Sequence, residues 1–291
     1  AGLTDIEGNP IAALEDVESA LVEETSFLTQ ELDSWIYGIL DDGWARGSRR
    51  VQAEGEKGLS NFLHERFTGL GATISHVLQA LDGFRSQWGS LDTPWTWSEE
   101  RVRSLAYHLR CKLFPIHIAA NKADSAKGTP WQSIESNGIV QPTMADMELA
   151  LRRADSANLV SYSPGSDTFN IIDESKLSPA QLSALFGMKS KLLDAGGTGV
   201  AELLTKVLFD ALDHVVVYPV ADENGWKDGD GHVLPDAFVV PNKIEAKALA
   251  YKVHSDLGDG FIKGVDGRSR RVVGADYECE NNDVIKIHAR L

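Results

Sequence analysis

Apolar residues over the greater part of the chain recur at three- and four-residue spacing. The first such stripe runs through Leu14, Val17, Leu21 and Leu28. An apolar face with this period is typical of an amphipathic helix, so the pattern predicts a helix over residues 12–42. The same reasoning predicts further helices over residues 48–68, 73–84, 98–112, 145–155, 178–194 and 199–212.

Two short apolar runs interrupt this helical period in the middle of the chain. They cover residues 113–120 and 138–143, and polar or helical sequence lies between them. Short apolar runs in such a setting are typical of buried parallel strands. The order helix, strand, helix, strand therefore predicts an α/β fold with a parallel sheet and helical crossovers.

The pattern changes again from about residue 215. Short β-rich runs now alternate with turns, and one predicted helix, over residues 244–256, lies among them. This arrangement predicts a small mixed β unit with a single helix. Its predicted strands cover residues 215–220, 235–240, 261–265, 270–273 and 283–288.

The composition is that of a folded chain, with 43% hydrophobic and 24% charged residues. Its only two cysteines, Cys111 and Cys279, lie far apart and form no disulfide framework or metal-ligand pattern, which favours a reducing, cytoplasmic compartment. No apolar run approaches the roughly 18 to 20 residues that cross a bilayer, so no membrane association is expected. The net charge of −15 repels nucleic-acid backbones, so contact with RNA would need a local basic patch.

The loop Asn121-Lys122-Ala123-Asp124 directly follows the first apolar run. Ligands of open α/β sheets bind beyond the carboxyl ends of the strands, where this loop is predicted to lie. The carboxylate of Asp124 can accept from both the N1–H and the N2 amine of guanine, and the amide of Asn121 can bond the N7 side. The aliphatic stem of Lys122 can cover the face of the base. The loop therefore predicts guanine recognition; the competing interpretation is a polar turn rich in turn-forming residues.

These residues, together with the carboxyl-terminal unit, resemble the Obg-related GTPases of the YchF type, in their archaeal branch. The resemblance covers nearly the whole chain and is carried by residues 4–10, 35–40, 197–200, 234–240, 248–262, 270–278 and 282–287. It implies a partial P-loop G domain over residues 1–213, with a helical insertion at about 25–95, and a TGS domain with a ubiquitin-like β-grasp fold over 214–291. It also implies GTP and GDP as ligands and a translation- or ribosome-associated role.

The resemblance also implies a second base-reading loop, formed by Thr143, Met144 and Ala145. In such proteins a backbone N–H of this loop faces the O6 of guanine, and Ala145 is in place for that contact. Met144 stands where serine is usual, which is expected to loosen base binding. Many YchF-type relatives prefer ATP and lack Asn-Lys-x-Asp; because adenine has no N1–H for a carboxylate, the intact Asp124 favours GTP here.

The phosphate half of a nucleotide site is missing from the sequence, which contains no Gly-x-x-x-x-Gly-Lys-Ser/Thr motif. Gly196-Gly197-Thr198-Gly199 has no Gly-Lys pair and follows a predicted helix, so it is interpreted as a turn between helices, with Thr198 near a helix start. Complete family members hold the P-loop, switch loops and Mg²⁺ ligands in a segment that would precede Ala1. Phosphoryl transfer depends on positioning and neutralising the phosphates. The chain alone is therefore expected to be inactive as a GTPase, with Mg²⁺ bound only in the complete protein.

The densest basic cluster comprises Lys263, Arg268, Arg270 and Arg271, which are candidates for contact with RNA phosphates. A solvated hairpin is the alternative interpretation. Two hypotheses for the whole chain follow. It is a fragment of a translation-associated GTPase, or it is a non-catalytic RNA- or ribosome-binding adaptor that has lost the nucleotide site. The coding sequence upstream of Ala1 would distinguish them.

Overall fold

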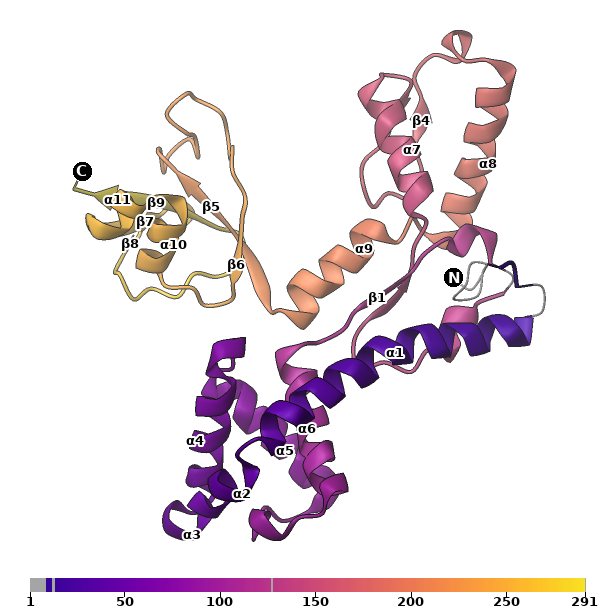
Figure 1. The fold of residues 1–291 in the computed structure, drawn as a ribbon. Helices are drawn as coiled ribbons and strands as arrows, with labels where there is room; N and C mark the ends of the chain where they lie inside the picture. Colours follow the sequence, from indigo (N-terminus) through magenta and orange to yellow (C-terminus); the bar gives the residue numbers. More distant parts are fainter. Residues whose placement is uncertain (1–8, 12–13, 127, 291) are drawn as a thin grey trace. The chain divides into compact units, whose positions relative to one another are not determined.

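A computed structural model describes residues 9–11, 14–126 and 128–290 of the chain (Figure 1). Most of the stretch 4–10 that contributes to the family resemblance, and the first two residues of the predicted helix 12–42, lie outside this described part. The chain divides into two compact units, residues 1–203 and 204–291. None of the helices in the described part combines the length and apolar character of a membrane-spanning segment.

The first unit begins with a layer of helices that confirms most of the helical predictions. These helices are α1 (Leu14–Asp41), α2 (Trp44–Gly47), α3 (Val51–Glu54), α4 (Glu56–Phe67), α5 (Ile74–Trp88) and α6 (Glu99–Leu113), with the 3₁₀ turns η1 (Ser48–Arg50), η2 (Thr68–Leu70) and η3 (Pro94–Thr96). The predicted helix 48–68 is broken at Gly55, whose φ of 63° and ψ of −157° are not helical. Ser98 caps α6 by accepting a hydrogen bond from the backbone N–H of Arg101, as the acidic first turn suggested.

A continuous apolar core holds these helices together. Ile36 and Leu40 of α1, Leu63 of α4, Phe84 of α5 and Leu105 of α6 are all fully buried in it. Aromatic rings fill its outer edge, where Phe84 stacks on Trp97 with ring centroids 4.7 Å apart. Burial of these large apolar side chains is the main contribution to the stability of the helical layer.

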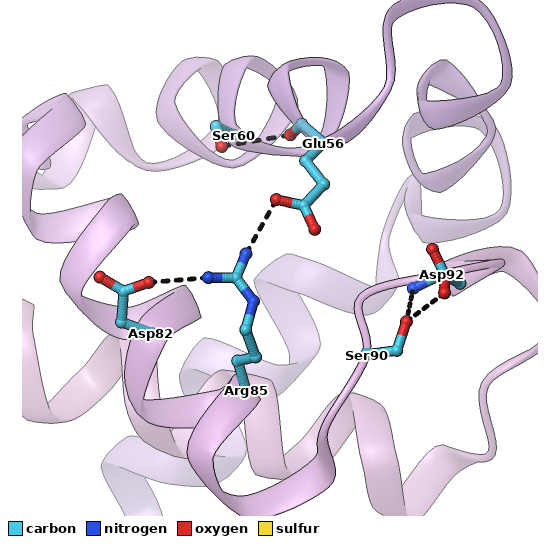
Figure 2. A network of polar contacts seen from close by, with 6 residues as sticks. All are labelled: Glu56, Ser60, Asp82, Arg85, Ser90 and Asp92. Carbon is cyan, nitrogen blue, oxygen red and sulfur yellow. Dashed lines mark hydrogen bonds and ion pairs between the residues drawn. The ribbon is translucent and has the colours of Figure 1, made fainter.

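A polar network on the surface links α4 to α5 (Figure 2). The guanidinium of Arg85 lies between two carboxylates, 2.8 Å from Glu56 and 3.0 Å from Asp82. On the following loop, the backbone N–H of Asp92 donates to the hydroxyl of Ser90 at 2.9 Å. The ion-paired side chains are largely exposed, so each pair contributes at most about 1 kcal/mol.

Two parallel strands follow the helical layer, β1 (Ile118–Ala120) and β2 (Val140–Pro142), with Ile118 opposite Val140 and Ala120 opposite Pro142. The predicted strand 113–120 is too long, which corrects the sequence-based boundary. Leu113 still belongs to α6, and Pro115 has no backbone N–H with which to pair in a ladder. The parallel pairing itself confirms the α/β prediction.

The part of the first unit that follows β1 has a second apolar core. Its elements are α7 (Ala145–Ser156), β3 (Val160–Ser161), β4 (Asn170–Ile171) and α8 (Pro179–Ala195), with the 3₁₀ turns η4 (Ala123–Ser125), η5 (Pro130–Ser133) and η6 (Glu174–Lys176). Helix α9 (Val200–Thr205) runs across the boundary between the two units. Leu151 of α7, Leu192 of α8 and Phe169, which directly precedes β4, are buried together. The predicted helices 145–155 and 178–194 are confirmed, whereas the antiparallel β3–β4 hairpin was not predicted because each strand spans only two residues.

The second unit is a mixed five-stranded sheet with the strand order β6-β5-β9-β7-β8. Only the β5–β9 pair is parallel. Leu249 of α10 packs with Val217, Val240 and Ile285 of the sheet. The elements are η7 (a π-helical turn, Lys206–Ala211), β5 (His214–Val220), β6 (Phe238–Pro241), α10 (Ala246–Val253), α11 (Ser255–Asp259), β7 (Phe261–Asp266), β8 (Val272–Val273) and β9 (Asp283–Ala289).

The five predicted strands of this unit are confirmed, and a helix covers one face of the sheet as a β-grasp fold requires. The predicted helix 244–256 is interrupted, because His254 has the extended backbone angles φ −162° and ψ 143°. Its imidazole then accepts a hydrogen bond from the backbone N–H of Asp256 and starts α11.

Candidate functional site

Two loops meet at the carboxyl ends of β1 and β2. Asn121 to Asp124 follow β1 directly, and Thr143 to Ala145 follow β2. Because the strands are parallel and adjacent, both loops lie at the same edge of the sheet, the edge where α/β folds bind ligands. The structure thus brings together all six residues that sequence analysis proposed for base recognition.

Backbone hydrogen bonds join the two loops. The N–H of Thr143 donates to the carbonyl of Ala120 at 3.0 Å, and the N–H of Ala123 donates to the carbonyl of Thr143 at 3.0 Å. Lys122, which precedes Ala123, has a left-handed φ of 60° and an exposed side chain. The reversal at Lys122 is followed by the 3₁₀ turn η4, which contains Asp124.

The side-chain oxygen of Asn121 ties the second loop to the first. Its Oδ1 accepts the backbone N–H of Ala145 at 3.1 Å and the hydroxyl of Thr143 at 3.4 Å. The N–H of Ala145, which the sequence placed opposite the guanine O6, therefore has a protein partner here. A base would have to share this donor with Asn121.

Asp124 is paired with a lysine that sequence analysis did not identify. The ammonium of Lys191, in α8, lies 3.2 Å from Oδ2 of Asp124 and 3.3 Å from its backbone carbonyl. The Asp124 side chain remains 25% exposed, so one side of the carboxylate stays open to a ligand. A single lysine on an amphipathic helix carries no sequence pattern that could have revealed this contact.

Thr143 and Met144 are almost fully buried and support the site from behind. The side chain of Met144 belongs to the apolar core that includes Leu151 and Leu192. Its backbone N–H donates to the carbonyl of Thr198 at 2.8 Å. The turn at Gly196–Gly199 is thus a turn between helices, as predicted, and it also fixes the second loop of the site, which was not predicted.

A buried carboxylate anchors this turn. Glu148 of α7 accepts hydrogen bonds from Thr198 at 2.5 Å, Tyr162 at 2.8 Å and Arg152 at 2.6 Å. Burial raises the pKa of Glu148, but these three donors together outweigh it and hold the pKa below its ordinary value. Burial and the neighbouring Glu148 raise the pKa of Tyr162. Glu148 is therefore a charged structural group that links α7, Tyr162 and the turn.

The predicted basic cluster is only partly assembled. Arg268, Arg270 and Arg271 lie exposed on the turn between β7 and β8, whereas Lys263 lies half-buried within β7. Arg268 donates to the carbonyl of Asn282 at 2.9 Å, and Arg270 donates to the side-chain oxygen of Asn224. In the described part of the chain, none of these three guanidinium groups has a carboxylate oxygen within 4 Å. Arg268 nevertheless interacts with the charge of Asp266 and lies over the Trp226 ring at 5.4 Å. The charges of Arg270 and Arg271 are therefore the more open to an anion.

A small group of possible metal ligands lies in the second unit. Asp228, Asp230 and His232 each offer one ligand atom within 4.8 Å of the others. However, Asp228 already accepts the backbone N–H groups of Asp230 and His232, and its second oxygen contacts the His232 ring at 2.9 Å. Hydrogen bonds from His232 and the backbone hold the pKa of Asp228 below its ordinary value. These contacts make the residues a closed hairpin turn.

Comparison with known proteins gives two matches to protein families. Residues 119–222 match the family described as Obg-like GTPase YGR210-like, G4 motif-containing domain. Residues 231–289 match the TGS domain. The first match begins within β1 and includes both loops of the candidate site, and the second covers most of the five-stranded unit.

Longer relatives match the chain as a whole. The GTP-binding protein MJ1332 of Methanocaldococcus jannaschii is 41% identical over 293 residues, which cover 99% of this chain and 70% of that protein. The crystal structure of a GTP binding protein from Pyrococcus horikoshii OT3 matches with a TM-score of 0.66 and 34% identity, covering 99% of this chain and 76% of the other. The YchF GTPase of Schizosaccharomyces pombe shares the fold, with a TM-score of 0.50 and 12% identity over 98% of this chain and 70% of the other.

Proposed function

The chain belongs to the Obg-like GTPases of the YGR210-like, YchF-related type, and on this premise we propose that its β1 and β2 loops bind the guanine base of GTP and GDP. The TGS domain match over residues 231–289 lies in the same chain. A loop that reads guanine must accept the hydrogen-bond donors of guanine and exclude adenine. Asn121 and Asp124 are the residues of this chain that can do so.

The observation that carries the proposal is the placement of Asp124. Its carboxylate stands beside the carboxyl end of β1, partly exposed, on a loop that hydrogen bonds lock to its neighbour. An ionised carboxylate has two acceptor oxygens and no donor, which matches the adjacent N1–H and N2 amine of guanine. Adenine presents an unprotonated N1 to the same carboxylate, so two acceptors would face each other.

The aliphatic part of Lys122 and the loop around Ala145 complete the proposed base pocket. Lys122 is exposed beside Asp124 and can cover one face of the base with its methylene groups. Buried Thr143 and Met144 contribute by holding the backbone of the second loop in place. We expect the base to compete with Asn121 for the Ala145 N–H, which lowers affinity relative to a free donor.

Hydrolysis needs groups that the sequence does not supply. It contains no Gly-x-x-x-x-Gly-Lys-Ser/Thr motif to hold the β- and γ-phosphates. Because phosphoryl transfer is driven by positioning and charge neutralisation, base recognition alone gives no catalysis. We therefore propose that this chain alone does not hydrolyse GTP and that Mg²⁺ binds only where phosphate-binding residues are also present.

The direct test is a calorimetric titration of the chain with guanosine and with adenosine. Guanosine should bind more tightly, and Asp124→Ala should abolish the difference between the two nucleosides. Asp194→Ala removes another exposed aspartate, at the end of α8, and is the matched control; it should leave the difference intact. Equal binding of both nucleosides to the unmodified chain would refute guanine recognition.

A second function, contact with RNA or a ribosomal surface, is favoured by the turn that carries Arg268, Arg270 and Arg271. The net charge of the chain is −15, so three exposed arginines on one turn are a local exception. In the described residues, Arg270 and Arg271 form no ion pair with a carboxylate. Such a patch suits phosphate oxygens. We propose that the TGS domain begins at His214, where β5 starts, and meets RNA through this turn in the cytoplasm.

The salt dependence of RNA binding tests this second function. Each phosphate contact with single-stranded RNA should steepen the plot of log K against log salt by about 0.7. Arg270→Ala with Arg271→Ala should weaken binding and flatten the slope, whereas Lys252→Ala, in α10, should not. An unchanged slope would exclude the turn as the contact and would leave the adaptor hypothesis without its interface.

A further inference from the structure

Lys191 reaches the candidate base site from an element far away in the sequence. It lies in α8, and its ammonium contacts Asp124 in η4, 67 residues earlier. Asp124 is the proposed guanine-reading residue, so this ion pair connects α8 directly to the base site. Lys191 belongs to neither loop and has no role in the function proposed so far.

The backbone of Lys191 is held firmly relative to the two loops. Its neighbour Leu192 is fully buried, and Leu185 two turns earlier is also buried in the same core. That core includes Met144 from the second loop and receives Ala123 from the first. Because protein cores are close-packed, α8 and both loops are fixed to one another. The ammonium is therefore delivered to Asp124 from a rigid support.

The contact restrains Asp124 in two places at once. The Lys191 ammonium donates to Oδ2 at 3.2 Å and to the backbone carbonyl of the same residue at 3.3 Å. A cation that bridges the side chain and the main chain of one residue favours a single side-chain rotamer. A free aspartate would lose rotamer freedom when it binds a base, and this cost is reduced when the rotamer is fixed beforehand.

The pair leaves room for guanine. A carboxylate has two oxygens with about four acceptor positions, and Lys191 occupies one of them on Oδ2. The remaining positions can take the N1–H and the N2 amine. The side chain of Lys191 is 50% exposed, so its ammonium can shift slightly as the base enters without losing solvation.

We propose that Lys191 is a positioning residue for guanine recognition: it holds the Asp124 carboxylate in the orientation that pairs with N1–H and the N2 amine. This inference rests on the proposed base-reading function and names the group that supports its central residue. Lys191 thereby contributes to the discrimination between guanine and adenine without touching either base.

The opposite role, in which Lys191 blocks the site by occupying Asp124, makes a contrary prediction. A blocking ion pair must break before the base binds, so its removal would strengthen guanosine binding. A positioning ion pair persists in the complex, so its removal weakens guanosine binding and leaves adenosine binding unchanged. The sign of the effect separates the two roles.

Calorimetric titration of Lys191→Met with guanosine and adenosine tests the proposal. Methionine keeps the length and apolar stem of the side chain but has no charge. We expect guanosine affinity to fall about two- to five-fold, the range of a partly exposed ion pair, with no change for adenosine. Lys191→Arg should retain most of the affinity. Lys189→Met, on the same helix beside Phe169, is the matched control and should bind both nucleosides normally.

A double substitution shows whether Lys191 acts through Asp124. Once Asp124→Ala has removed the carboxylate, adding Lys191→Met should have no further effect. Unchanged or tighter guanosine binding in Lys191→Met overturns the proposal, as does an equal loss for both nucleosides. If the unmodified chain prefers guanosine and Asp124→Ala loses this preference while Lys191→Met keeps it, only the role of Lys191 fails. If the unmodified chain shows no preference, base recognition fails, and the role of Lys191 fails with it.

Discussion

At the scale of single residues, the account depends on the pattern of donors and acceptors at Asp124. A carboxylate accepts hydrogen bonds at both oxygens and donates none, and this is complementary to the two adjacent donors of guanine. The surrounding contacts serve that one group: Lys191 restrains it, Asn121 joins the loops, and Lys122 provides the backbone reversal. Changing the donor pattern at this position should change the base that is bound.

Asp124→Asn should shift the preference of the chain from guanosine to xanthosine. An amide offers one donor and one acceptor, which match the C2 carbonyl and the N1–H of xanthine, whereas guanine would meet a second donor. A matched bidentate pair discriminates by about 1–3 kcal/mol, so the preference should change by about ten-fold or more. Competition between the two nucleosides measures it, with Asp194→Asn as the control. A variant that still prefers guanosine would show that the base is read elsewhere.

Glu148 should make the stability of the first unit depend on pH. Hydrogen bonds from Thr198, Arg152 and Tyr162 hold its pKa below the ordinary value of 4.5 although burial opposes them. A depressed pKa stabilises the folded state at pH values above the ordinary value, and this contribution is lost as the pH falls through the folded-state pKa. Glu148→Gln should therefore cost about 2 kcal/mol at pH 7 and much less at pH 3.

Urea unfolding of Glu148→Gln and of the unmodified chain at both pH values measures this difference. Glu174→Gln, an exposed position in η6, is the control and should unfold like the unmodified chain at both. A loss of the same size at pH 7 and pH 3 would mean that the charge of Glu148 does not stabilise the fold.

At the scale of elements, the turn between α8 and α9 determines where the second base loop lies. A Cβ at Gly199 would lie 2.0 Å from the carbonyl oxygen of Pro142, and its φ is +75°. Gly196 has a similar φ of +74° but open space around it. An alanine at Gly196 would therefore cost backbone strain alone, whereas an alanine at Gly199 would cost backbone strain and the displacement of β2.

Gly199→Ala should destabilise the chain more than Gly196→Ala. Backbone strain alone costs about 1–2 kcal/mol at either position, and the clash with Pro142 adds to it only at Gly199. Chemical denaturation measures both costs, and guanosine binding should weaken in Gly199→Ala alone because its loop is displaced. Equal destabilisation by the two substitutions would contradict the close approach of the turn to β2.

The sequence predicted the elements that have a strong local pattern. It did not predict the bounds of elements that depend on contacts with distant parts of the chain. The stripe through Leu21 and Leu28 and the cap at Ser98 are local features, and both helices were found. The strand before Asn121 was predicted too long because apolar residues continue from α6 through an irregular segment that contains Pro115. Apolar content alone does not distinguish a buried connection from a strand.

The candidate site was predicted in part for the same reason. Asn121 to Asp124 are contiguous and follow a strand, so their position at the sheet edge could be predicted from the sequence. Lys191, Glu148 and Thr198 act on the site from separate helices and a turn, and only the tertiary structure brings them there. Of the basic cluster, the turn Arg268–Arg271 is local and was assembled as expected, whereas Lys263 lies apart on β7.

At the scale of the whole molecule, the two units have separate apolar cores. Each unit contains one cysteine. Cys111 in α6 is half-buried, and Cys279 in the β-grasp unit is fully buried. Burial, with the nearby charge of Asp283, raises the pKa of Cys279 to about 12. The thiolate is the reactive form, so the two cysteines should report on the two units with very different rates.

Thiol labelling of the folded chain at pH 8 should modify Cys111 first and leave Cys279 intact. Cys279 should react only when the second unit unfolds, which makes its labelling rate a measure of that unit's opening. Cys111→Ser removes the fast reaction and is the control. Rapid labelling of Cys279 in the folded chain would show that the core around Val217 and Ile285 is open.

An NMR titration of the labelled chain tests guanine recognition by the β1 and β2 loops most directly. Amide signals of residues 121–124 and 143–145 should shift on addition of guanosine, saturate with concentration and stay unchanged at the same concentrations of adenosine. Shifts confined to the TGS unit, or equal shifts of the loop signals with both nucleosides, would contradict the account.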